Sequence, residues 1–184
     1  MTVRRGFVLA VLLAGAVLAG VLLRAGGHGN PTVARVGGEP VTRKQLDAAV
    51  DHFRVEAKAE GKPFPAEGSD AFRRVRDQLL ALLVYRTELR QAAARLGVRV
   101  ARVEVVRRLQ RSGEPGETDR DSFEYGSVET QLFLERISAK VARGITAPTL
   151  AERAARRNRA LSRYLARLRR ETKVRYEPGY APGP

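Results

Sequence analysis

The chain has 184 residues, a formal net charge of +14 and no cysteine. The lack of cysteine excludes disulfides, a thiol nucleophile, cysteine metal ligands and a lipid-modified cysteine. The length is sufficient for one domain with a hydrophobic core, and the positive charge favours anionic or acidic partners.

The first feature along the chain is an apolar run from Gly6 to Leu23, flanked by Arg4, Arg5 and Arg24. A helix needs about 20 apolar residues to span a bilayer, with a lower limit of about 17, and this run has 18. It is longer than the apolar part of a signal peptide, and no A-x-A cleavage site ends it. We therefore favour an uncleaved membrane anchor over residues 1–24, with the bulk of the chain outside the cytoplasm. A cleaved signal peptide, which would make the protein secreted, is the alternative.

A β-hairpin is predicted directly after this segment. Residues 25–31 are rich in glycine and predict a flexible linker. Two β-prone runs, Val33–Val36 and Glu39–Val41, then flank Gly37-Gly38, which is a hairpin signal. Because Pro40 has no N–H to donate, its strand is expected at the edge of a sheet.

Five helices follow, each indicated by apolar residues spaced three or four apart. Capping-box spacings at Thr42–Gln45 and Thr149–Glu152 mark the beginning of the first and the last helix. We expect the helices at about residues 43–60, 69–96, 103–110, 122 or 127 to 142, and 149–171. Lys173–Glu177 predicts a closing strand, whose pairing with the hairpin the spacing alone leaves open. The tail from Tyr180 is expected to fray.

The sequence contains no recognisable catalytic, cofactor or metal site. No HExxH, GxxxxGK[ST] or supported serine–histidine–aspartate pattern is present. His52 is interpreted as an ordinary surface or boundary histidine. The acidic loop at 112–121 lacks the EF-hand spacing and is interpreted as a solvated loop. We expect no cofactor and favour a protein without enzymatic activity.

Positive charge is concentrated near the end of the chain. Leu150–Glu177 contains ten basic residues against three acidic ones. A basic surface beside a bilayer attracts anionic lipid or steers acidic clients, and nucleic-acid binding is the less favoured alternative. Codon bias toward arginine is the ordinary explanation of the excess.

Four segments resemble the SurA and PrsA family of extracytoplasmic foldases. Val33–Thr42, VARVGGEPVT, is close to the family's opening VAxVNGxxIT, with Gly37 where asparagine is usual. Val75–Leu80 and Leu89–Val100 are similar to the family's long-helix pattern VLDQLIxxxLLxQxAxxLGIxV. Tyr164–Gly179 is similar to its closing helix and strand, YLxxLRxxAKVxY.

The resemblance covers about residues 32–110 and 149–180 and implies a mainly α fold. The expected domain, residues 32–180, is a bundle of about five helices with a small β-hairpin and a closing strand, followed by a disordered tail at 181–184. Most family members carry parvulin prolyl-isomerase domains between these parts. Here only Ser112–Pro148 is available, which is too short for one. The resemblance therefore implies the chaperone core without isomerase activity, although homology could still attach an isomerase label.

In the family, long helices form a cradle that shields unfolded segments. The implied function is that of a membrane-anchored holdase or foldase assistant, with unfolded or nascent secreted polypeptides as partners. Candidate client-binding residues are aromatic side chains outside the strongest apolar ladders: Phe64, Phe123, Tyr125 and Phe133. Core packing is the alternative interpretation of each. A basic lipid-binding or nucleic-acid-binding protein and an envelope interaction scaffold are the alternative functions.

Overall fold

The computed structural model describes residues 30–112, 119 and 122–181 of the chain. Residues 31–184 form one compact unit. The apolar run Gly6–Leu23, most of the linker and the last three residues lie outside the described residues. Among the helices that are described, none is both long and apolar enough to cross a bilayer.

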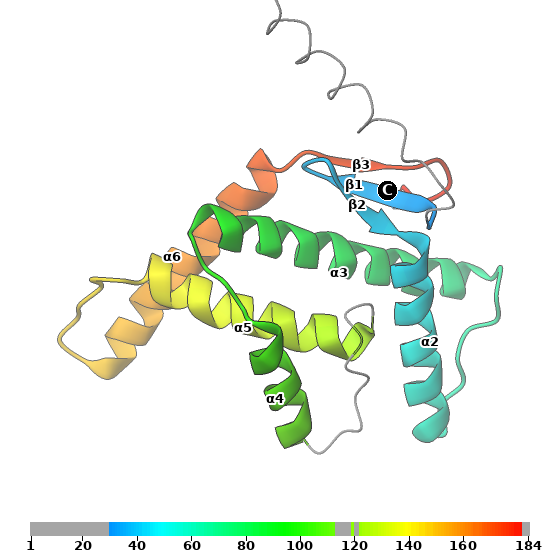
Figure 1. Ribbon diagram of the computed structural model, residues 1–184, viewed down its shortest axis with the longest axis horizontal. Helices are drawn as coiled ribbons and strands as arrows, with labels where there is room; N and C mark the ends of the chain where they lie inside the picture. The colour runs from blue at the N-terminus through cyan, green and yellow to red at the C-terminus, as the bar shows by residue number, and fades with distance from the viewer. Residues whose placement is uncertain (1–29, 113–118, 120–121, 182–184) are drawn as a thin grey trace, which may run out of the picture. The chain divides into compact units, whose positions relative to one another are not determined.

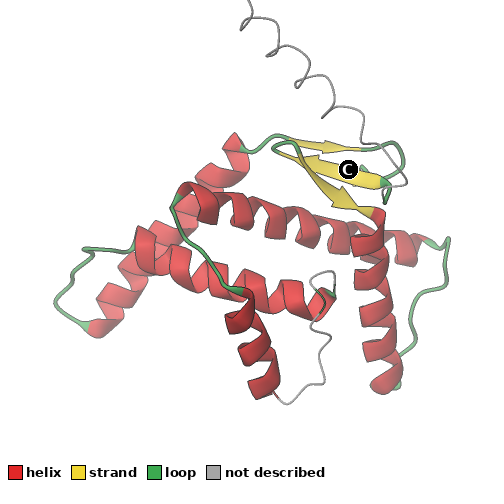
Figure 2. Cartoon of the chain, in the orientation of Figure 1, coloured by secondary structure: helices red, strands yellow, loops and turns green. Residues whose placement is uncertain are grey.

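The described elements are five helices and three strands (Figures 1 and 2). The strands are β1 Thr32–Val36, β2 Glu39–Thr42 and β3 Val174–Tyr176. The helices are α2 Arg43–Ala59, α3 Asp70–Arg95, α4 Arg102–Ser112, α5 Phe123–Val141 and α6 Leu150–Glu171. The mainly helical architecture that the sequence predicts is confirmed.

The three strands form one antiparallel sheet in the order β2-β1-β3. Pro40 lies on the edge strand β2, where its missing N–H costs no ladder bond. The strand from the end of the chain pairs with the first strand: Gly37 N donates to Lys173 O at 2.9 Å, and Glu177 N donates to Val33 O at 3.0 Å. The pairing that the spacing left open is therefore present, and it joins both ends of the unit.

Side-chain caps fix the beginnings of the helices. Thr42 Oγ1 accepts from Gln45 N at 3.3 Å, and Gln45 Oε1 accepts from Thr42 N at 2.9 Å, which completes the predicted capping box of α2. The predicted box at Thr149 is also present. Ser122 caps α5, so this helix begins at the earlier of the two expected positions.

Helix α3 is the centre of the unit: the sheet lies along one side of it and α5 along the other (Figure 1). The buried apolar residues of the unit form three groups, two of which include α3. One joins the sheet, α2 and α3; the second joins α3, α5 and α6; the third joins α4 and α5. The largest fully buried side chains are those of Val33, Val36, Val41, Leu46, Leu80, Leu89, Val105 and Ile137.

The end of the chain differs from its prediction. Tyr180, expected to fray, packs partly buried against the core of the sheet, α2 and α3. Its N–H donates to Glu177 O at 3.1 Å, and the Arg76 guanidinium lies 5.4 Å from the centre of its ring. Because β3 pairs with β1, the turn after β3 lies next to α3. The Tyr180 side chain therefore packs on the apolar surface there.

Candidate client-binding surface

An open groove of about 420 Å³ runs between α2, the beginning of α3 and Tyr180. We call it the α2–α3 groove. Its apolar lining residues are Leu46, Val50, Phe72 and Tyr180. Its charged lining residues are Arg43, Asp47, Asp51, Arg54, Glu67 and Arg76. Leu46 and Val50 are core residues, 2% and 6% exposed, so the half-buried Phe72 and Tyr180 are the accessible apolar side chains of this lining.

Four of the six charged residues that line this groove, which we call its rim, take part in ion pairs. Arg54 donates to Asp51 Oδ1 at 2.7 Å and to Glu67 Oε1 at 2.8 Å, and it thereby ties α2 to the loop before α3. Arg76 Nη2 donates to Asp77 Oδ1 at 3.0 Å and to Gly179 O at 3.3 Å. Since the lining contains three arginines and three carboxylates, the rim favours neither strongly acidic nor strongly basic partners.

Phe64, one of the four predicted residues, lies beside this groove. Its ring makes an edge-on contact with Phe72, a lining residue, with 6.3 Å between the ring centres. The Arg54 guanidinium lies 5.5 Å from the centre of the Phe64 ring. Phe64 is half-buried, and it adjoins the groove through its contact with Phe72.

Phe123, the second predicted residue, is the first residue of α5, and its ring packs against α2. Its ring stacks on His52 with the ring centres 4.6 Å apart, and it meets Phe53 edge-on at 5.2 Å. His52 Nδ1 is 2.7 Å from Glu124 Oε1. These contacts fasten α2 to α5. His52 is therefore a boundary residue with a defined partner.

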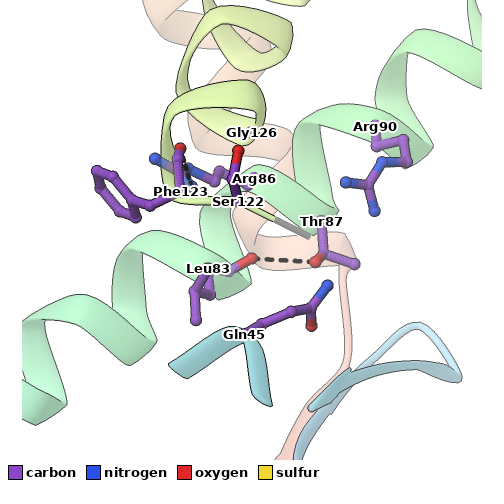
Figure 3. Close-up of a pocket in the computed structure, with 8 residues that line it drawn as sticks. All are labelled: Gln45, Leu83, Arg86, Thr87, Arg90, Ser122, Phe123 and Gly126. Carbon is purple, nitrogen blue, oxygen red and sulfur yellow. Dashed lines mark hydrogen bonds between the residues drawn. The ribbon is translucent and has the colours of Figure 1, made fainter. Parts of the chain in front are cut away.

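Beneath Phe123 lies a small cavity of about 40 Å³ at the junction of α2, α3 and α5 (Figure 3). Its size suits a few water molecules. Its lining residues are Gln45, Leu83, Arg86, Thr87, Arg90, Ser122, Phe123 and Gly126.

Arg86 is the unusual member of this lining, because it is a cation only 8% exposed. It donates to Ser127 Oγ at 2.5 Å and to Phe123 O at 3.4 Å, and its Nε has no hydrogen-bond partner in the described part of the chain. Burial, followed by the nearby charge of Arg90, lowers the pKa of Arg86 to about 10. The side chain therefore remains charged at neutral pH.

Tyr125 and Phe133, the remaining predicted residues, are core residues, 3% and 8% exposed. Tyr125 packs with the α4 residues Val105 and Leu109, and Phe133 packs against α3. They follow the alternative interpretation, core packing, because α4 and α3 cover the faces of α5 that carry them. The structure thus brings only Phe64 to the groove, and a client-binding role of the four stays a prediction.

Sequence reasoning missed the groove itself. Leu46 and Val50 are themselves core residues, and the half-buried Phe72 has the same helical periodicity, so periodicity alone does not separate a groove residue from a core residue. Arg86 had a usable signal: it lies three residues after Leu83 and three before Leu89, both on the buried face of α3. Within the described parts of the chain, no group of three or more His, Asp or Glu side chains is placed to hold a metal ion.

The fold defines a helical module closed by a three-stranded sheet that joins its two ends. A comparison with protein families matches residues 2–135 to the SurA-like N-terminal domain. The chain belongs to this family of chaperone-like foldases, as the sequence resemblance implies, and no parvulin domain is detected. The match ends within α5, so α6 and β3 lie outside it. No curated protein matches the chain.

Proposed function

We propose that this protein is a membrane-tethered, extracytoplasmic chaperone that holds unfolded polypeptide segments in the α2–α3 groove and has no isomerase activity. Family membership supports the general class, because SurA-like domains bind unfolded polypeptides. The observation that carries the proposal is the groove, where the half-buried aromatic side chains of Phe72 and Tyr180 lie beside a mostly paired charged rim.

This groove suits clients of varied sequence. Short apolar stretches of an unfolded chain would pack on Phe72 and Tyr180, while backbone amides and side chains of either charge would meet the rim. Binding would be weak for each segment, because Arg54, Asp51 and Glu67 are solvent-exposed, and exposed charges gain little energy from an ion pair with a client. Weak and unselective contact is what a holdase needs in order to release its client.

The proposed tether rests on the sequence of residues 6–23, which is long and apolar enough for a membrane-spanning helix. It would keep the groove close to polypeptides that emerge from the membrane. Cleavage of this segment would leave the groove unchanged and release the module.

An aggregation assay tests the proposal. Residues 31–184, the compact unit, are mixed with a chemically unfolded client at physiological salt, and light scattering is followed over time. We expect suppression at a near-stoichiometric ratio. The variant Phe72→Ala should suppress less well, whereas the control Val103→Ala, which truncates an exposed apolar residue on α4, should behave as the unmodified protein. No suppression with several clients would refute the chaperone function.

A further inference from the structure

Helix α6 carries a row of five arginines along one face: Arg156, Arg159, Arg163, Arg167 and Arg170. We call this row the arginine stripe. Its spacing of three, four, four and three residues places all five on the same side of the helix. All five are exposed, and the row is about 21 Å long at a rise of about 1.5 Å per residue.

The charge of this stripe is almost uncompensated. Among the described carboxylates, only Glu171 pairs with a member of the stripe, at 3.8 Å from Arg167, and both side chains are more than half exposed. Arg156 donates to a backbone carbonyl, that of Thr146, at 3.2 Å. Like charges three and four residues apart destabilise a helix. Folding therefore does not explain the stripe.

Part of the stripe lines an open pocket. Arg156, Arg159 and Arg163 surround a hollow of about 470 Å³ together with Gly144, Ile145 and Thr146, and no carboxylate is among the lining residues. Guanidinium groups bind phosphate through paired, charge-assisted hydrogen bonds. Three of them around one hollow form a receptor for a phosphate-bearing group.

The partner has to be extended and anionic. A row of charges on the exposed face of a helix that crosses α5 and α3 (Figure 1) matches a flat array of phosphates. The apolar run Gly6–Leu23 in the same chain is suited to hold the module at a bilayer. At an anionic membrane surface, each arginine would strengthen docking by about fivefold.

We propose that the arginine stripe docks α6 on anionic phospholipid headgroups. This inference rests on the proposed membrane tether. Docking would fix the orientation of the groove relative to the membrane, which the tether alone leaves free.

The experiment uses the full chain, reconstituted into nanodiscs of phosphatidylcholine with or without phosphatidylglycerol. Because the chain contains no cysteine, Ala166→Cys gives a single labelling site. Ala166 is exposed and lies between Arg163 and Arg170 on the stripe face. A fluorophore there is quenched by a headgroup-attached quencher only when α6 lies on the membrane.

We expect strong quenching in anionic discs at physiological salt and little in neutral ones. Arg159→Gln with Arg163→Gln should weaken docking by about 25-fold. The matched control, Arg74→Gln with Arg175→Gln, removes the same charge from exposed positions elsewhere and should have little effect. Circular dichroism should show equal helix content in all variants.

Two results would overturn the inference. If the chain inserts into discs but quenching is the same with and without phosphatidylglycerol, the stripe does not recognise lipid, and the tether stands alone. Tight binding of a single-stranded oligonucleotide through the stripe at physiological salt, together with that result, would identify nucleic acid as its partner. If the chain does not associate with discs of either composition, both the tether and the docking are wrong.

Discussion

The guanidinium carbon of Arg86 lies 4.1 Å from the centre of the Phe123 ring, across the contact between α3 and α5. The same side chain donates to the backbone carbonyl of Phe123 and to Ser127. A buried cation without an ion-pair partner among the described residues is thus held by a ring face and two neutral acceptors. The cost of desolvating the Arg86 guanidinium offsets much of the stability that these contacts contribute to the fold.

Two substitutions of Arg86 should separate the contribution of its charge to the free energy of unfolding from the contribution of its volume. We expect Arg86→Met to change the free energy of unfolding by less than about 1 kcal/mol, because lost contacts and relieved desolvation nearly cancel. Arg86→Ala should cost about 2–3 kcal/mol, because it leaves a cavity under Phe123. Urea denaturation of residues 31–184 measures both values. An Arg86→Met variant as unstable as Arg86→Ala would show that the charged contacts dominate.

Gly37 stands where the motif that Val33–Thr42 resembles has asparagine, and the structure offers a reason for glycine there. Gly37 has a φ of 55°, which asparagine tolerates. A Cβ there, however, would lie 2.6 Å from Gln91 Oε1, and Gln91 is held in place because it donates to Val36 O at 2.6 Å. We expect Gly37→Asn to lower the free energy of unfolding by about 1 kcal/mol. In a Gln91→Ala background, Gly37→Asn should leave the free energy of unfolding nearly unchanged. An equal loss of stability in both backgrounds would show that a clash with Gln91 is not the cause.

Replacing the buried Glu88 by glutamine should stabilise the fold in a pH-dependent way. Its side chain is 5% exposed, and burial raises the pKa of its carboxyl above the ordinary 4.5, although Arg169 lowers it in part. The folded state therefore binds the proton more tightly than the unfolded state, and this group destabilises the fold increasingly as pH rises through the folded pKa. Glu88→Gln should thus be more stable than the unmodified protein at pH 7, with the gain disappearing below pH 4.5. Thermal unfolding over this range measures it, and a gain that persists at low pH would contradict this cause.

Phe64 and Phe123 should behave differently when truncated. Phe64→Ala removes a ring beside the groove and should weaken client holding several-fold at little cost in stability. Phe123→Ala removes stacking with His52, Phe53 and Arg86 and should cost about 1–3 kcal/mol of stability. Aggregation assays and urea denaturation of each variant separate the two effects. Reversed outcomes would move the client surface from the groove to the α2–α5 contact.

The helices and strands follow from signals that are local in the sequence. Threonine and a partner three residues later begin α2 and α6, and Gly37-Gly38 turns the hairpin, because these effects act within a few residues. The pairing of β3 with β1 depends on a contact between the two ends of the unit. Local signals are compatible with that pairing but do not determine it.

The candidate site was less predictable for the same reason. Tyr125 and Phe64 are both aromatic residues outside the strongest apolar ladders, yet α4 covers one and a loop leaves the other half-exposed. Whether an apolar side chain lies in a core or on a groove depends on which element packs over it. In this unit, the return of Tyr180 over α3 completes the groove, and no pattern within α2 or α3 indicates it.

Site-specific crosslinking tests the central proposal, that the α2–α3 groove holds clients, most directly. Since the chain has no cysteine, Asp47→Cys places a photoreactive group at an exposed position of the groove, and Val103→Cys places the same group on the exposed surface of α4. We predict that an unfolded client crosslinks to position 47 and that an unlabelled unfolded competitor abolishes the product, with little crosslinking at position 103. Equal crosslinking at both positions, or a product only at position 103, would contradict the groove as the client-binding site.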